Sequence, residues 1–177
     1  YLRTLGKDDP VAMFVSRPTS GQVAQDRVDG FTETIMAAFP NARVIVEGDV
    51  GAGSADSAQS LVENVLQREP VIDVVSGHND AEVRGAYLAA VAANRDEIKF
   101  IGIAGAREVL QYIADGNEAW IGEVLQDPVV LGYQARDAMY KSLILGEEVP
   151  LKYELPEPEK ITPDNIGDYD WETWSWL

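Results

Sequence analysis

The loop from Ser76 to Asp80 holds the residue types that a hydrolase would use: a serine, the only histidine (His78) and an aspartate. At this spacing on one loop, the three side chains cannot easily form the chain of nucleophile, base and orienting acid. The sequence also lacks a G-x-S-x-G turn and any cysteine, which excludes thiol nucleophiles and thiolate metal sites. We therefore expect no enzyme activity, and one histidine cannot form a multi-histidine metal site.

A glycine-rich stretch from Gly48 to Gly53 invites comparison with dinucleotide-binding loops. The third glycine of a G-x-G-x-x-G pattern is missing, because Asp56 stands at its position. An acidic residue there would repel a pyrophosphate. We therefore expect a flexible loop and no cofactor.

Three polar residues suit the binding of a small molecule. The amide of Asn79 offers both a donor and an acceptor, which matches a ligand hydroxyl, although an asparagine here also suits a helix cap. Arg17 offers a fork of donors for a ring oxygen or a carboxylate, and its alternative role is a surface ion pair. His78 either contacts a ligand or has a structural role.

Short apolar runs alternate with longer helical patterns along most of the chain. The runs that predict strands are 11–15, 43–46, 71–75, 98–103, 119–125 and 149–155. The stretches that predict helices are 21–39, 54–66, 80–94, 107–114 and 128–145. This succession predicts an α/β fold with an open parallel sheet and helices on both faces, a three-layer α/β/α arrangement.

The strand-to-helix loops of such a sheet lie along one edge, because the crossovers are right-handed. Open α/β sheets bind their ligands at this edge, outside the carboxyl ends of the strands. The segments that we expect there are 16–17, 47–53, 76–80, 104–107 and Gln126. Function should therefore be sought among these residues.

The formal net charge of -16 limits the partners of this chain. Binding of nucleic acid needs clustered Lys and Arg, so a nucleic acid partner is excluded. No run approaches the roughly 20 apolar residues of a membrane span. An acidic surface that keeps a secreted protein in solution accounts for the charge, and a salt-adapted source would fit as well.

Five segments, in this order, resemble motifs of the type I periplasmic sugar-binding proteins, such as the ribose-, galactose- and autoinducer-2-binding proteins. They are Arg27-Val28-Asp29-Gly30-Phe31, His78 to Ala86, Lys99-Phe100-Ile101-Gly102-Ile103, Asp115 to Gly132, and Ile161 to Ile166. The ordered set covers nearly the whole chain. The resemblance implies a lobe of the periplasmic-binding-protein-like I fold.

The resemblance also implies a set of ligand-binding residues. The family uses the asparagine at the position of Asn79 to bind sugar hydroxyls. Gln126 falls at a hinge crossing where the family places a ligand-binding Gln or Asn, with a simple hinge residue as the alternative. Gln25 stands where ribose-type members carry an arginine that grips the sugar, and it has no charge and a shorter reach. With Arg17 and His78, these residues make up the expected site.

Two positions depart from the pattern of the ribose- and galactose-type members. Ala104 stands where those members place an aspartate that binds two hydroxyls, and Gly53 stands near the position of a ring-stacking aromatic residue. Together with Gln25, these departures argue against a ribose or galactose pocket. They favour a deoxy sugar, a polyol or an autoinducer-2-like furanose.

Family members have two similar lobes, and these 177 residues match the C-terminal lobe and the tail. Residues 10–126 are expected to form the ligand-binding lobe, and residues 127–150 to pack on the missing N-terminal lobe. Residues 151–177 would form the last hinge crossing and a tail. The tail's Trp171, Trp174 and Trp176 are expected to pack on the lobe or on a neighbouring chain.

The resemblance implies the substrate-binding component of a bacterial sugar ABC transporter. Such a protein binds a sugar or sugar-like molecule between its lobes and presents it to a membrane permease. It would be periplasmic or extracellular, with or without a lipid anchor. The alternative is the effector-sensing domain of a LacI-type regulator or a membrane sensor. A helix-turn-helix upstream of Tyr1 would indicate a regulator, and a signal peptide would indicate transport.

Overall fold

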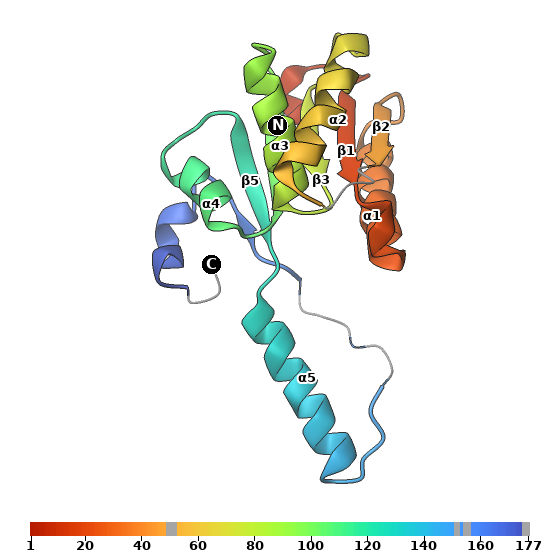
Figure 1. The fold of residues 1–177 in the computed structure, drawn as a ribbon, viewed down its shortest axis with the longest axis vertical. Helices are drawn as coiled ribbons and strands as arrows, with labels where there is room; N and C mark the ends of the chain where they lie inside the picture. Colours follow the sequence, from red (N-terminus) through yellow and green to blue (C-terminus); the bar gives the residue numbers. More distant parts are fainter. Residues whose placement is uncertain (49–52, 151–152, 154–156, 175–177) are drawn as a thin grey trace.

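The computed structural model describes residues 1–48, 53–150, 153 and 157–174 (Figure 1). The strands are β1 (Val11–Ser16), β2 (Arg43–Gly48), β3 (Val74–Gly77), β4 (Lys99–Ala104), β5 (Trp120–Leu125) and β6 (Lys160–Ile161). The α-helices are α1 (Gln22–Ala38), α2 (Ala55–Arg68), α3 (Asp80–Ala92), α4 (Arg107–Ala114) and α5 (Pro128–Leu143). The short 3₁₀-helices are η1 (Leu2–Leu5), η2 (Pro18–Ser20), η3 (Ile166–Asp168) and η4 (Trp171–Thr173).

The strands form one sheet in the order β2-β1-β3-β4-β5-β6. The pairs among β1 to β5 are all parallel, which confirms the expected α/β sheet. The last strand differs from the expectation, because β6 is short and pairs antiparallel with β5. Of the strand expected at 149–155, residues 149, 150 and 153 are not in a strand, and 151–152 and 154–155 lie outside the described residues.

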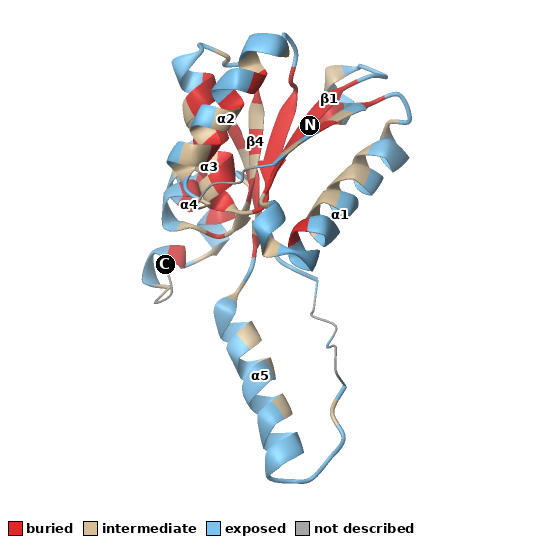
Figure 2. Cartoon of the chain, turned by 45° about the vertical axis from the view of Figure 1, so that its right-hand side comes forward, coloured by how far each residue is buried: buried red, intermediate tan, exposed pale blue. Residues whose placement is uncertain are grey.

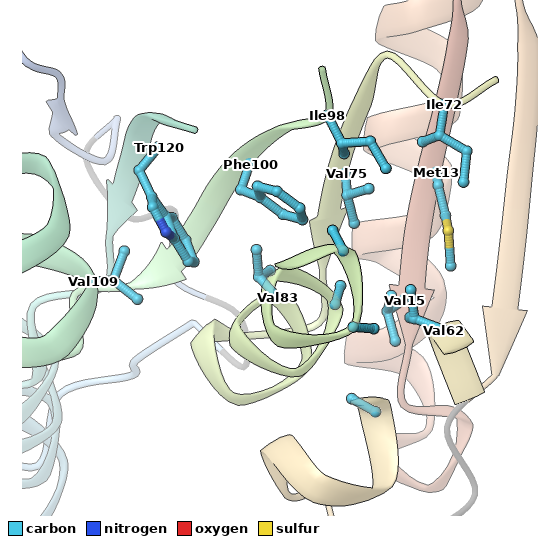
Figure 3. Close-up of a cluster of buried hydrophobic side chains, with 14 of the residues drawn as sticks. Met13, Val15, Val62, Ile72, Val75, Val83, Ile98, Phe100, Val109 and Trp120 are labelled. Atoms are coloured by element: carbon cyan, nitrogen blue, oxygen red, sulfur yellow. The ribbon is translucent and has the colours of Figure 1, made fainter. Parts of the chain in front are cut away.

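Helices cover both faces of the sheet (Figure 2). Helices α2, α3 and α4 lie on one face, over a core of aliphatic and aromatic side chains that includes Met13, Val83 and Trp120 (Figure 3). Helix α1 lies on the other face, where Phe31 and Ile35 pack near Ala12 and Val74. All six residues of β1 are buried, because this central strand has helices over both of its faces.

The helix boundaries follow from local signals in the sequence. Ser54 caps α2 by accepting a hydrogen bond from the Ser57 N–H at 3.2 Å. Asp127 caps α5 in the same way, with Pro128 at the first helical position. Strand β3 begins later than expected and runs to Gly77, since His78 still donates to the Val15 carbonyl at 2.7 Å.

Helix α5 projects from the edge where the parallel strands end, away from the sheet (Figures 1 and 2). None of its residues is buried among the described residues, and its apolar side chains include Tyr140, which is 56% exposed, and Leu143, which is 72% exposed. No described helix combines the length and apolar character that a membrane crossing requires. The chain returns beside β5, where the Leu125 N–H donates to the Glu159 carbonyl at 2.9 Å.

The described part of the tail packs on the lobe. Trp171 is buried in the main core, and Trp174 packs against it and against Tyr169. Arg107 of α4 donates to the Glu172 carbonyl at 3.2 Å. This packing agrees with the first of the two expectations for the tryptophans, and Trp176 lies outside the described residues.

A buried pair of carboxyl groups fixes the end of β4. Asp80 accepts hydrogen bonds from the N–H groups of Ile103 at 2.8 Å, Gly105 at 3.0 Å and Ala106 at 2.6 Å. Glu123 accepts from Gly105 at 2.7 Å. The turn that supplies these N–H groups has a positive φ of 132° at Ala104, a conformation that an alanine adopts only where its surroundings impose it.

Burial raises the pKa of Glu123 to about 10, and the charge of Asp80 and a hydrogen bond with it act in the same direction. Burial also raises the pKa of Asp80, but its backbone N–H partners oppose that shift. At neutral pH, therefore, Glu123 holds a proton.

We expect Glu123→Gln to change how stability depends on pH. The pKa of Glu123 is raised from 4.5 to about 10 on folding. The stability that this group contributes is therefore fully present below pH 4.5 and is lost as the pH rises toward about 10. The slope is at most about 1.4 kcal/mol per pH unit. A glutamine is neutral in both states, so the free energy of unfolding of the variant, relative to that of the wild type, should rise from pH 5 to pH 9. Urea denaturation measures this difference, and a difference independent of pH would contradict the assignment.

We expect Gly102→Ala to destabilise the protein. A Cβ at Gly102 would lie 1.9 Å from Oε2 of Glu123 and 2.6 Å from Oδ1 of Asp80, and both side chains are buried. Overpacking of this kind costs about 1–3 kcal/mol or more in the free energy of unfolding. The control is Gly30→Ala in α1, where a Cβ meets no atom within 4 Å and helix propensity favours alanine by about 0.5–1 kcal/mol. Equal effects of the two substitutions on urea denaturation would refute the prediction.

Candidate functional site

The strand order places a topological switch point at the carboxyl ends of β1 and β3. The helix that follows β1 covers one face of the sheet and the helix that follows β3 covers the other, so the chain diverges between these two strands. Ligands of doubly wound sheets bind at such a point. Arg17 follows β1 directly, and His78 and Asn79 follow β3. Three of the five expected site residues therefore meet at one place.

Arg17 is held in a fixed position by a buried carboxylate. Its Nε donates to Oε1 of Glu82 at 2.7 Å, and its Nη2 lies 2.6 Å from the same oxygen. The side chain of Glu82 is fully buried. Arg17 also donates to the Gly53 carbonyl at 3.1 Å, and a Cβ at Gly53 would lie 2.2 Å from Cζ of Arg17. Glycine at this position therefore leaves room for the guanidinium, where the family pattern suggested an aromatic side chain nearby.

Asn79 caps α3, which is one of the two roles expected for it. Its Oδ1 accepts from the Ala81 N–H at 2.9 Å, and its own N–H donates to Oε2 of Glu82 at 3.2 Å, which completes a capping box. Among the described residues, no hydrogen bond uses the side-chain Nδ2 of Asn79. The cap therefore occupies only the acceptor half of the amide and leaves its donor half for another group.

Arg27 connects the loop after β3 with the crossing after β5. One nitrogen of its guanidinium donates to the His78 carbonyl, and Nη2 donates to Oε1 of Gln126 at 3.0 Å. This bridge brings Gln126 into the same cluster as His78 and Asn79. Gln126 is exposed, and its backbone N–H donates to the Ala104 carbonyl at 3.2 Å.

The imidazole of His78 is 6% exposed, and its Nδ1 has no hydrogen-bond partner among the described residues. Burial lowers the pKa of His78, and the charges of Arg27 and Arg17 lower it further. The ring is therefore neutral at neutral pH and acts as a hydrogen-bonding group.

The structure does not bring Gln25 into this cluster. Its side chain is exposed on α1 and donates to Asp29 one turn further along the helix, at 2.7 Å. The side chain of Ser76 donates to the Ile101 carbonyl at 3.0 Å, and Asp80 accepts from backbone N–H groups. Among the described residues, Ser76, His78 and Asp80 therefore do not form a chain of nucleophile, base and acid.

Two residues of the cluster were missed as site residues by sequence reasoning. Arg27 was noticed only as part of a family motif, and nothing in its local sequence shows that its guanidinium reaches Gln126. Glu82 had a local signal, because an asparagine followed three residues later by a glutamate is the pattern of a capping box.

The cluster is a set of hydrogen-bond donors on an open edge. Among the described residues, a cavity of about 230 Å³ lies at the opposite end of the sheet, where Tyr87, Lys99 and Asn117 line it. Residues 49–52 of the expected ligand edge lie outside the described residues. An arrangement of this kind can hold polar groups of a ligand, and it becomes enclosed only when a second surface covers it.

Comparison with known proteins gives a consistent result. The family model described as periplasmic binding protein domain matches residues 1–148. Among curated proteins, none matches the chain. A solute-binding protein of an ABC transporter from Agrobacterium vitis, solved with bound allitol, is 25% identical, with a TM-score of 0.80. The match covers 94% of this chain and 58% of that one.

Two further structures show the same relation. An ABC transporter solute-binding protein from Mycobacterium smegmatis, with bound glycerol, is 26% identical over 94% of this chain and 56% of that one, with a TM-score of 0.79. A periplasmic solute-binding protein from Actinobacillus succinogenes, with bound D-allose, is 18% identical, covers 95% and 58% and has a TM-score of 0.80. This chain thus spans somewhat more than half the length of these proteins. The family resemblance in the sequence is confirmed, and the chain belongs to the type I periplasmic binding proteins.

Proposed function

We propose that this chain is the C-terminal, ligand-binding lobe of a solute receptor for a sugar or polyol ABC importer. The observation that carries the proposal is the cluster of Arg17, Arg27, Asn79 and Gln126 at the carboxyl edge of the sheet. Its donors suit hydroxyl oxygens. The related structures were solved with D-allose, glycerol and allitol, which are polyhydroxylated molecules.

The mechanism would be binding without chemistry. A second lobe would close over the ligand by rotation at the crossings next to Leu125 and Glu159. Closure would exclude water from the donors, which strengthens their hydrogen bonds. The closed shape would then be presented to a membrane permease outside the cytoplasm. The affinity would come from donors that Glu82 and the α3 cap already hold in place.

A ligand screen on the full-length protein that carries this chain tests the proposal. Sugars, polyols, autoinducer-2 and amino acids would be compared by thermal shift. A ligand at 100 times its Kd stabilises the bound fold by about 2.7 kcal/mol. Because the related proteins are considerably longer than this chain, that raises the melting temperature of the full-length protein by roughly 4 °C. A shift produced by an amino acid and by no sugar or polyol would refute the proposal.

Two substitutions at Asn79 separate ligand binding from helix capping. Asn79→Ser keeps a cap acceptor and loses the amide donors, so the melting temperature without ligand should stay close to that of the wild type. Its affinity for the identified ligand should fall about tenfold or more, as expected for a lost hydrogen bond. Asn79→Ala should lose affinity and also about 1 kcal/mol of stability. Calorimetric titration measures the affinity, and wild-type binding by Asn79→Ser would exclude Asn79 from the site.

We also propose that α5 packs against the second lobe. Val129, Tyr133, Tyr140 and Ile144 lie on one face by helical spacing, and all four are exposed in the described structure. The related proteins extend well beyond the matched length, which leaves room for such a lobe.

Tyr140→Asp in the full-length protein should therefore lower the free energy of unfolding by about 2 kcal/mol or more, because it buries a charge. Ser142→Asp adds the same charge on the opposite face of α5 and should have little effect. Denaturation of both variants measures the difference. Equal stability of the two would show that the apolar face of α5 stays in solvent.

A further inference from the structure

The two edges of the sheet differ in how their outward-facing backbone groups are used. Strands β2 and β6 lie at these edges (Figure 1). At β6, the side chain of Asn165 donates to the Lys160 carbonyl at 2.9 Å and accepts from the Thr162 N–H at 2.6 Å. These contacts occupy polar groups on the side of β6 that faces away from β5, so that edge is protected against pairing with a further strand.

Strand β2 leaves its outward-facing backbone groups open at the other edge. The Arg43 N–H donates to the Pro10 carbonyl at 2.9 Å, so the polar backbone groups of Arg43 and of every second residue after it face β1. The polar backbone groups of Val44 and Val46 therefore face away from the sheet. Among the described residues, no strand pairs with this side of β2, and no side chain forms a hydrogen bond with the backbone of these two valines. An edge of this kind is a template for another strand.

The sequence of β2 is complementary to itself. Arg43 and Glu47 flank the three apolar residues Val44-Ile45-Val46. An antiparallel pair of two β2 strands centred on Ile45 places Arg43 of each copy opposite Glu47 of the other. In the same register Val44 lies opposite Val46, so the outward-facing backbone groups of the two strands meet as an antiparallel ladder requires. Registers centred on Val44 or on Val46 also match the backbone groups, but they lose both charge pairs.

Helix α2 already holds the two charged side chains at this edge. Arg43 pairs with Glu69, and Glu47 pairs with Arg68. Among the described residues, each of these pairs joins one nitrogen to one oxygen, which leaves the other atoms of both groups for a second partner. Two copies would therefore link the ion pairs into networks of alternating charge, which stabilise more than isolated pairs do. On the other face of β2, Val46 is 44% exposed and would gain an apolar neighbour.

We propose that the full-length protein forms a two-fold symmetric dimer, in which β2 of each copy pairs antiparallel with β2 of the other about an axis at Ile45. The sheets of the two lobes would then form one continuous sheet. A single pair of short strands makes a small interface, so we expect weak association, in the micromolar range or above. The pairing uses the side of the sheet and leaves the carboxyl ends of the other strands open. The proposal does not depend on which ligand the protein binds.

The experiment is sedimentation equilibrium of the full-length protein from low micromolar to near-millimolar concentration. We expect the wild type to change from monomer to dimer over this range. Arg43→Glu places a carboxylate opposite Glu47 of the second copy, and Glu47→Arg places a guanidinium opposite Arg43. Each variant alone should associate roughly tenfold more weakly or less, because two cross-strand attractions become repulsions. An equimolar mixture of the two variants should recover the dimer, since the facing positions then carry opposite charges.

A matched control and a second measurement support this test. Arg84→Glu makes the same change of charge in an exposed ion pair between α3 and α4, and it should dimerise like the wild type. Circular dichroism and the melting temperature verify that the variants fold. These 177 residues contain no cysteine, so Val44→Cys and Val46→Cys add thiols without a change of charge. Under mild oxidation, a mixture of these two variants should form disulfide-linked dimers faster than either variant alone, because only the mixture places two thiols opposite each other.

Three outcomes would overturn the proposal. A wild type that stays monomeric at every concentration would do so, whatever other strand this edge accepts. Full dimerisation of Arg43→Glu and of Glu47→Arg, each on its own, would place the contact on another surface. Disulfide formation by Val44→Cys or Val46→Cys alone, at the rate of the mixture, would exclude the register centred on Ile45. None of these outcomes affects the proposed function, which the ligand screen tests.

Discussion

The buried carboxyl pair of Asp80 and Glu123 holds the ligand edge together. Asp80 is the first residue of α3, its N–H partners lie at the end of β4 and directly after it, and Glu123 belongs to β5. The raised pKa of Glu123, about 10, keeps the two buried acids from both being charged at neutral pH. The pair thereby fixes the turn at Ala104, whose carbonyl accepts from Gln126 at the crossing to α5. The position of the crossing relative to the loop after β3 depends on this contact.

A second buried carboxylate organises the binding groups on the other side of that loop. Glu82 holds Arg17 with one oxygen and closes the α3 cap with the other. The same residue therefore fixes a guanidinium and the start of a helix. Arg27 spans the gap to Gln126 without such support. Glu82 thus holds Arg17 and the start of α3, while the hydrogen bonds of Arg27 go to neutral acceptors.

The lobe presents these groups on an open edge, and α5 leaves from the same edge. The proposed function would explain both features. A receptor that closes over its ligand needs a site divided between two bodies, because neither half alone should exclude water from the donors. Under that proposal, the exposed apolar face of α5 and the open cluster would both belong to the interface with the second lobe.

The sequence by itself determined the α/β class, five of the six strands and the α-helices, because these follow from apolar periodicity and local capping. Ordered motifs also identified the family. The candidate cluster was only partly predictable: Asn79, His78, Arg17 and Gln126 were proposed from their place after strands and lie in it, whereas Arg27 was not proposed and Gln25 lies apart. The tertiary structure alone decided the raised pKa of Glu123 beside Asp80 and the Arg27 bridge. These contacts join residues 43 and 99 positions apart, and no local pattern in a sequence encodes such distances.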